Sequence, residues 1–90
     1  MDREAARRLG KNLWRARRRA GYSQEEVAAL CSLHRTEIGL LENGRRLPRV
    51  DTLMKLSAAL DVRVGTLVEG IEWIPPASAT AGSFVVKEGR

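Results

Sequence analysis

The stretch from residue 23 to residue 44, SQEEVAALCSLHRTEIGLLENG, constrains the fold of this chain more than any other segment. Ser23 and Glu26 have the spacing of a capping box, in which each side chain bonds the backbone N–H of the other, so a helix begins there. Asn43 and Gly44 form a left-handed stop that ends a second helix. The stretch is therefore predicted to fold as two short helices that meet at a tight turn.

Apolar side chains at helical spacing predict a small core shared by these two helices. The inward-facing set is Val27, Ala28, Leu30, Cys31, Ile38 and Leu41. A second stripe of the later helix points away from that core, because its members recur at i, i+1, i+4, i+5 and i+8. We interpret this stripe as the functional surface, and its members are Arg35, Thr36, Gly39, Leu40 and Asn43.

Positive charge is concentrated in the first half of the chain. The 90 residues carry 16 Lys and Arg against 11 Asp and Glu, for a net charge of +5. Residues 1–49 hold 12 basic and 6 acidic side chains, a balance of +6, so the rest of the chain is close to neutral. This asymmetry indicates a polyanion bound on one side, with a merely solvated basic surface as the alternative.

Composition also argues against several classes of protein. A single cysteine, Cys31, cannot form an intramolecular disulfide, and one histidine, His34, is too little for a structural zinc site. No apolar run approaches the roughly 20 residues that span a bilayer, and the Arg-rich start lacks the apolar stretch of a signal peptide. We therefore expect a reduced, cytoplasmic protein with no metal, no cofactor and no membrane partner. An enzyme is not expected either, because no nucleophile, orienting acid or glycine-rich phosphate loop accompanies His34.

Helical periodicity extends over most of the remaining chain. Helices are predicted over 3–20, about 50–60 and about 64–69, so 1–70 is expected to form one compact five-helix domain. From residue 71 the sequence alternates weakly around a Pro-Pro pair, which predicts a short β-hairpin or arm, with a disordered tail as the alternative. The first helix carries a narrow apolar stripe of Ala5, Leu9, Leu13, Ala16 and Ala20.

Several single residues have their own local interpretation. Arg17 lies close to the apolar stripe, so we expect it either to pair with Glu42 or to reach solvent along its aliphatic stem. Trp14 is expected to bury its indole against a surface outside the helix pair. His34 either caps the following helix or meets a phosphate. Gly39 costs its helix about 0.5 to 1 kcal/mol, which makes sense if something must approach the backbone closely.

Over residues 9–70 these features resemble the helix-turn-helix family of phage repressors, Cro proteins and related bacterial regulators. That resemblance implies an all-α, lambda-repressor-like domain that binds double-stranded DNA and regulates transcription. It also implies a homodimer, whose two copies place residues 34–43 in successive major grooves about 34 Å apart. The residues that carry the resemblance are Arg17, Gly21, Tyr22, Ser23, Gln24, Ala28, Leu33, Ile38, Leu41, Glu42, Asn43, Gly44, Pro48 and 53–62.

The same resemblance implies roles for individual side chains. Base edges would be read by Arg35 and Thr36 at the start of the groove helix, and by Gly39 and Leu40 one turn later. Arg35 can bond guanine through two N–H groups, whereas Leu40 either touches a thymine methyl or is simply exposed. Phosphate contacts, which fix register, are implied for Gln24, Asn43, Arg45 and Arg46.

Three positions depart from the family pattern, and the C-terminal extension lies outside it. Ser32 replaces the usual turn glycine, where a left-handed backbone would cost about 1 kcal/mol, and Arg49 replaces a capping Ser or Thr. Glu37 stands beside the groove face, where it either opposes phosphate, accepts from a cytosine amine or orients Arg35. The dimer surface is expected within 62–74. An alternative function is a protein-binding module, such as an antitoxin or bridging factor, that acts through 84–86.

Overall fold

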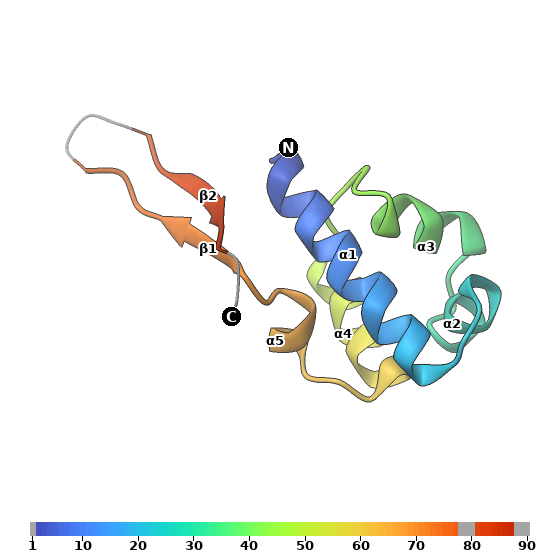
Figure 1. Ribbon diagram of the computed structural model, residues 1–90. Coiled ribbons are helices and arrows are strands. Elements are labelled where there is room, and N and C mark those ends of the chain that lie inside the picture. The colour runs from blue at the N-terminus through green and yellow to red at the C-terminus, as the bar shows by residue number, and fades with distance from the viewer. Residues whose placement is uncertain (1, 78–80, 88–90) are drawn as a thin grey trace.

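A computed structural model describes residues 2–77 and 81–87 of the chain. Within these residues, five helices form one body and a two-stranded antiparallel hairpin extends from it (Figure 1). The elements are α1 (Arg3–Ala20), α2 (Gln24–Leu30), α3 (Arg35–Glu42), α4 (Val50–Leu60), α5 (Val64–Leu67), β1 (Ile71–Ile74) and β2 (Ser83–Val86). The fold class that the sequence predicts, a five-helix domain with a C-terminal hairpin, is confirmed.

Local capping interactions set the ends of the first two helices. The Asp2 carboxylate accepts a hydrogen bond from the backbone N–H of Ala5 at 3.0 Å, and α1 ends at Gly21, whose φ is 80°. The predicted capping box is present: the Ser23 N–H donates to Glu26 Oε1 at 2.7 Å, and the Glu26 N–H donates to Ser23 Oγ at 3.0 Å. These bonds satisfy backbone donors that a helix N-terminus otherwise leaves unpaired.

Every helix contributes to a single hydrophobic core. A side chain of this size contributes about 1.5 to 3 kcal/mol when it is fully removed from water. The largest fully buried apolar side chains come from all five helices and are Leu13, Val27, Ile38, Leu41, Leu56 and Leu67. Cys31 is also buried, and this burial raises the pKa of its thiol, while the positive charge of Lys55 acts in the opposite direction. The predicted role of Cys31 as a small buried side chain is confirmed.

Three side chains that were expected to be buried lie at the surface instead. Leu30 is 55 % exposed because α2 packs through the face that holds Val27 and Cys31, and Leu30 points to the flank of that face. Ala20, the last residue of α1, is exposed at the edge of a surface groove. Trp14 is 44 % exposed, and the Arg18 guanidinium lies 5.2 Å from the centre of its ring.

The hairpin has one apolar face. Cross-strand neighbours share a face, so the pairs Ile71–Val86 and Trp73–Phe84 place four apolar side chains together. The Trp73 and Phe84 rings meet edge to face with their centroids 5.0 Å apart. Both strands contact α1 near their inner ends, and the hairpin then projects beyond the helices (Figure 1). Within the described residues, no helix has the length and apolarity needed to cross a membrane.

Candidate nucleic-acid interface

The predicted stripe on α3 faces away from the core. Arg35, Thr36 and Asn43 are exposed, whereas Gly39 and Leu40 are half-buried. On the other side of the same helix, Ile38 and Leu41 are fully buried. The stripe of exposed residues therefore arises because α3 packs through one face only.

His34 begins this helix. It is the N-cap residue, and its Nδ1 atom accepts a hydrogen bond from the backbone N–H of Thr36 at 3.1 Å. Capping, one of the two roles expected for His34, is thus what the structure shows. Ser32 in the preceding turn has a φ of 55°, so the predicted left-handed conformation is present. Together these residues fix where α3 starts and the direction in which its first turn points.

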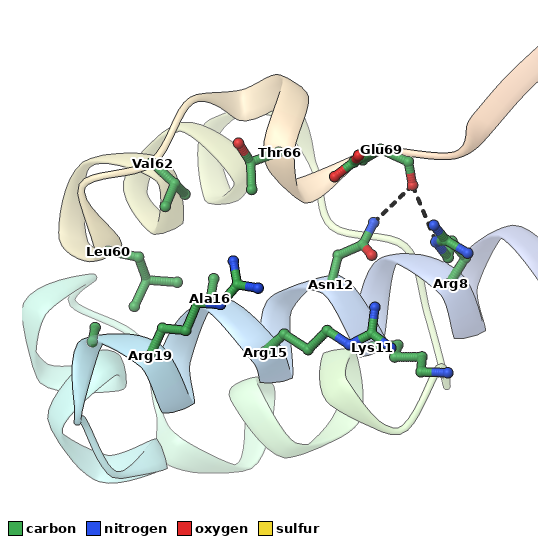
Figure 2. A pocket seen from close by; sticks show the side chains of 11 residues that line it. Arg8, Lys11, Asn12, Arg15, Ala16, Arg19, Leu60, Val62, Thr66 and Glu69 are labelled. Atoms are coloured by element: carbon green, nitrogen blue, oxygen red, sulfur yellow. Dashed lines mark hydrogen bonds between the residues drawn. The ribbon is translucent and has the colours of Figure 1, made fainter. Parts of the chain in front are cut away.

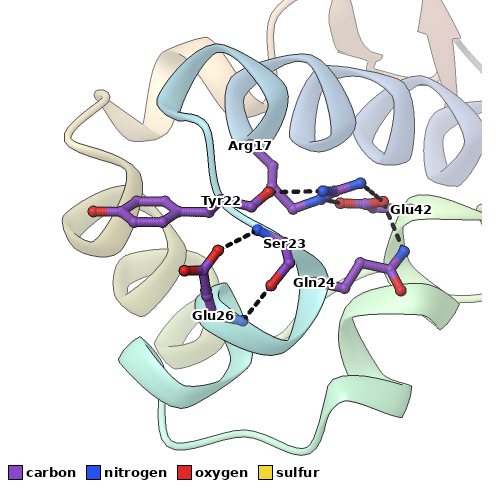
Figure 3. Close-up of polar contacts among 6 residues, drawn as sticks. All are labelled: Arg17, Tyr22, Ser23, Gln24, Glu26 and Glu42. Carbon is purple, nitrogen blue, oxygen red and sulfur yellow. Dashed lines mark hydrogen bonds and ion pairs between the residues drawn. The ribbon is translucent and has the colours of Figure 1, made fainter.

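A buried polar network connects the first three helices (Figure 3). Arg17 Nε donates to Glu42 Oε2 at 2.5 Å and Arg17 Nη2 donates to Glu42 Oε1 at 3.1 Å, with side chains 10 % and 4 % exposed. Arg17 also donates to the carbonyl of Tyr22 at 2.9 Å, and Gln24 Nε2 donates to Glu42 Oε1 at 3.0 Å. The predicted pairing of Arg17 with Glu42 is confirmed, and it holds α3 against α1 and α2.

Gln24 lies between this network and the exposed stripe. Its amide nitrogen is bound to Glu42, and its Oε1 lies 3.8 Å from the point where a Cβ on Gly39 would stand. Any larger side chain at position 39 would therefore meet Gln24 first. The half-buried Gln24 side chain lines the approach to the middle of α3, and its contact with phosphate stays a prediction.

Two of the three arginines assigned to DNA contacts, Arg35 and Arg46, have a carboxylate partner in the structure. Arg35 Nη1 lies 2.8 Å from Glu25 Oε2, and both side chains are about two-thirds exposed, at 65 % and 69 %. Arg46 Nη1 lies 3.3 Å from Glu37 Oε1. Glu37 therefore pairs with Arg46, whereas Arg35 pairs with Glu25. Sequence periodicity gave no sign of Glu25, because it is brought to Arg35 by the packing of α2 against α3.

The loop after α3 adds further positive charge. Asn43 is the C-cap residue of α3, and the following Gly44 has a φ of 70°. The predicted left-handed stop is therefore present. Arg45, Arg46 and Arg49 are all exposed in the segment that follows. Since Arg46 reaches Glu37 in the first turn of α3, this loop folds back along the helix.

Gly10 is a positioning residue that the sequence analysis did not identify. A Cβ built at Gly10 would lie 2.5 Å from the carbonyl oxygens of both Leu41 and Glu42. The backbone of α1 and the end of α3 can therefore approach this closely only at a residue without a side chain. The sequence does carry a signal for this role. Gly10 stands in the middle of a strongly helical stretch, where glycine costs about 1 kcal/mol relative to alanine.

These features define a class of protein. Two short helices joined by a tight turn, the second with a polar face turned outward and a basic loop beside it, form a helix-turn-helix DNA-binding domain. In agreement, residues 15–67 match the family model HTH_3, described as helix-turn-helix, and the chain belongs to this family. The family expected from the resemblance is confirmed, and the hairpin lies beyond the matched residues.

Individual relatives are similar over most of the helical body. An HTH-type transcriptional regulator of Sinorhizobium fredii, y4dJ, is 40 % identical over 67 residues, which cover 74 % of this chain and 87 % of that protein. The HTH-type transcriptional regulator ImmR of Bacillus subtilis is 38 % identical over 60 residues, 67 % of this chain and 47 % of ImmR. The restriction-modification controller protein C.AhdI from Aeromonas hydrophila has a TM-score of 0.67 and 34 % identity, and the match covers 69 % of this chain and 94 % of that structure.

The chain is accordingly a member of a family of DNA-binding transcriptional regulators. Two of these relatives are transcriptional regulators by name, and the third is a restriction-modification controller protein. Within the described residues, no cluster of three or more His, Cys, Asp or Glu side chains could hold a metal ion.

Proposed function

We propose that this chain is a sequence-specific regulator that binds operator DNA as a homodimer, with residues 34–43 in the major groove. The observation that supports this most directly is the exposed stripe on α3, held in place by the buried network of Arg17, Glu42 and Gln24. A groove-binding helix must keep a fixed orientation to read base edges, and this network ties it to two neighbouring helices.

Arg35 is the side chain best placed to discriminate between bases. It stands in the first turn of α3 and is 65 % exposed, so its guanidinium can reach beyond the helix surface. Its contact with Glu25 is a solvent-exposed ion pair, a kind that is worth about 0 to 1 kcal/mol. A bidentate contact to guanine discriminates against other bases by about 1 to 3 kcal/mol. The weak ion pair with Glu25 therefore does not prevent Arg35 from taking this role.

The other predicted contacts follow from the same orientation. Thr36 is exposed beside Arg35 and can donate to a base or touch a thymine methyl. Leu40 is half-buried, so only part of its side chain is free for a thymine methyl, and Gly39 leaves room beside it. Phosphates on either side would be bound by Gln24, Asn43, Arg45 and Arg46.

The hairpin is the surface that we assign to the homodimer. Trp73 is 52 % exposed and Phe84 is 40 % exposed, although both belong to the apolar face of the hairpin. A hairpin of two strands is only marginally stable alone, and a second copy of the same face would cover these rings. The alternative, a binding module centred on 84–86, is less favoured because Val85 and Val86 are half-buried.

The experiment that tests the assignment of roles compares Arg35→Ala with Arg46→Ala. DNA sequences selected from a random pool by the wild-type protein serve as the specific probe, and a shuffled duplex serves as the non-specific one. We expect Arg35→Ala to lose specific affinity and relax the preference at one base position. Arg46→Ala should weaken binding to all sequences alike and reduce the salt slope by about one.

The matched control is Arg63→Ala, which removes one exposed charge at the start of α5. It should change affinity for both duplexes by less than either of the other variants. Identical effects of Arg35→Ala and Arg46→Ala on both duplexes would contradict the division into base and phosphate contacts.

A further inference from the structure

A basic groove runs along the side of α1 that faces α5 (Figure 2). Its volume is about 620 Å³, which falls within the range of binding clefts in proteins. One wall is formed by a row of cations on α1, and the other by the end of α4, α5 and the segment after it, which includes Thr66 and the acidic Glu69. The residues that matter for its chemistry are Lys11, Arg15, Arg19, Ala16, Leu60 and Val62.

Three cations of this groove are evenly spaced along α1, in addition to Arg8 and the acidic Glu69, which also line it. Lys11, Arg15 and Arg19 stand at i, i+4 and i+8 of one helix, so their backbone positions rise by about 6 Å per step. Within the described residues, none of these three side chains has an ion-pair partner. Like charges at this spacing cost a helix about 0.2 to 0.5 kcal/mol per pair. The row therefore does not stabilise the fold and is available to a ligand.

Beneath the cations the groove has an apolar floor. Ala16 and Leu60 are 6 % and 5 % exposed, and Val62 beside them is half-buried. Away from Arg19, Asn12 Nδ2 donates to the carbonyls of Leu67 and Glu69 at 3.1 and 2.9 Å, and Arg8 lies beyond it (Figure 2). These bonds fix α5 against α1, so the two walls are held apart at a set distance. At the end that holds Arg15 and Arg19, the site thus places positive charge beside an apolar patch (Figure 2).

This groove lies on a different flank of α1 from the proposed DNA surface. Asn12 faces α5, and Arg17, five residues later on the same helix, faces α3. Both views show α1 between α3 and α5 (Figures 1 and 2). A ligand in the groove would therefore leave the exposed stripe of α3 uncovered.

The chemistry of the groove discriminates among possible occupants. A second copy of this chain fits poorly, because none of its described helices carries two acidic residues three or four positions apart. Two rows of uncompensated cations would also repel each other across a two-fold axis. A nucleic-acid backbone would match the cations but would offer nothing apolar to the floor of Ala16 and Leu60.

We propose that this groove binds an acidic amphipathic helix of a partner protein. Carboxylates at i, i+4 and i+8 of that helix have the same 6 Å rise as the row of cations, and an apolar side chain on its adjacent edge covers the floor. This combines two established modes of peptide recognition, an amphipathic helix in a groove and an acidic motif on an arginine cluster. The inference does not rest on the proposed DNA contacts, since it uses other residues on another flank.

The test uses the full chain and a labelled synthetic helix in fluorescence anisotropy. The probe is an 18-residue peptide with Glu at every fourth position and Leu on the adjacent edge; the comparison peptide has the same composition in scrambled order. We expect the patterned peptide to bind and the scrambled peptide to bind at least about tenfold more weakly, since the two differ only in whether charge and apolar contacts can form together. The variant Arg15→Ala/Arg19→Ala should weaken the patterned peptide by at least the same factor.

The matched control is Arg3→Ala/Arg18→Ala, which removes two charges from the same helix outside the groove. It should reduce peptide affinity by less than threefold, and circular dichroism should show equal helix content in both double variants. Equal losses in the two variants, or equal binding of the two peptides, would show general charge attraction and overturn the proposal. It would also be overturned if Arg15→Ala/Arg19→Ala weakened binding of a random-sequence DNA duplex or of inorganic pyrophosphate by as large a factor as it weakens the patterned peptide.

Discussion

At the scale of single residues, Glu42 is the side chain on which the orientation of α3 depends. Its carboxylate is 4 % exposed and accepts hydrogen bonds from both Arg17 and Gln24. A buried charge is stable only when it is paired and hydrogen-bonded. The network is therefore satisfied in one arrangement of the three helices. It fixes their relative orientation more than it adds net stability.

Loss of this carboxylate should be severe. We expect Glu42→Ala to lower the free energy of unfolding by about 3 to 5 kcal/mol, because Arg17 is then buried without its partner. Urea denaturation followed by circular dichroism measures the change. Glu25→Ala is the control, since it removes a carboxylate from an exposed pair with Arg35 and should cost at most about 1 kcal/mol. Similar losses in the two variants would contradict a special role for Glu42.

Cys31 links the stability of the core to pH. Burial raises the pKa of its thiol, so in alkaline solution the unfolded chain loses this proton before the folded one does. The folded state then binds more protons than the unfolded state, and the free energy of unfolding must fall as pH rises above the ordinary thiol pKa of about 8.5. Below that value Cys31 contributes no pH dependence, because both states are protonated.

The measurement compares wild type with Cys31→Ala by urea denaturation at several values between about pH 7.5 and 10. All the other side chains are the same in both proteins, so only the difference between the two curves reports on Cys31. We expect the wild-type protein to lose stability with pH more steeply, by at most about 1.4 kcal/mol per pH unit. Parallel curves would show that the thiol ionises equally in the folded and unfolded states.

At the scale of elements, the distance between α1 and α3 is set at Gly10. A Cβ there would stand 2.5 Å from two carbonyl oxygens of α3, which are backbone atoms that no side-chain rotation can move. We expect Gly10→Ala to cost about 1 to 3 kcal/mol as an overpacked contact and to displace the end of α3. Thermal unfolding and the change in DNA affinity together would measure both effects.

Gly65→Ala is the control for that substitution. A Cβ at Gly65 would meet nothing within 4 Å, so alanine should stabilise α5 by up to about 1 kcal/mol through its higher helix propensity. If Gly10→Ala were also neutral or stabilising, the close contact between α1 and α3 would not be required by the fold.

The sequence predicts element ends better than it predicts contacts between elements. Capping residues act on backbone groups only a few positions away, so the limits of α1 and the capping box at Ser23 could be read directly. Burial depends on how a neighbouring helix crosses, which no local pattern records. Leu30 was therefore misplaced in the core. The end of α5 is an exception among the element ends, because this helix ends at Leu67, two residues before the predicted limit of about 69.

The candidate site shows the same division. Arg17 and Glu42 could be paired from sequence because a charge near an apolar stripe requires a partner. The contact of Glu25 with Arg35 could not, since it joins exposed residues from two helices whose crossing was unknown. The individual base and phosphate contacts stay predictions, because they depend on how the DNA itself is approached.

At the scale of the whole molecule, the long first helix separates the proposed DNA surface from the basic groove. α3 lies on one flank of α1 and the basic groove on the other (Figure 1, Figure 2). The hairpin extends from the end of the helical body, which contributes to an elongated shape of 46 × 27 × 19 Å. DNA, a second copy and an acidic partner helix could therefore be bound at three places without competing for the same side chains.

The last prediction concerns the homodimer. If the apolar face of the hairpin pairs two copies, Trp73→Ser should weaken dimerisation by about 30-fold, the equivalent of the roughly 2 kcal/mol typical of a buried interface tryptophan. Sedimentation velocity measures the dimer, and Glu72→Gln, which removes an exposed ion pair with Lys87 from the opposite face of the same strand, should leave it unaltered.

Measurements of DNA binding distinguish a role of Trp73 in dimerisation from a role in folding. A monomer can still occupy one half-site, so Trp73→Ser should lose affinity for the full operator and keep its affinity for a duplex with a single half-site. The two half-sites reinforce each other only when the two copies are joined as a dimer. Higher protein concentration favours the dimer, so the loss of affinity for the full operator should shrink as concentration rises. An equal loss on both duplexes would show instead that Trp73 supports the helical body, and the dimer would have to form through another surface.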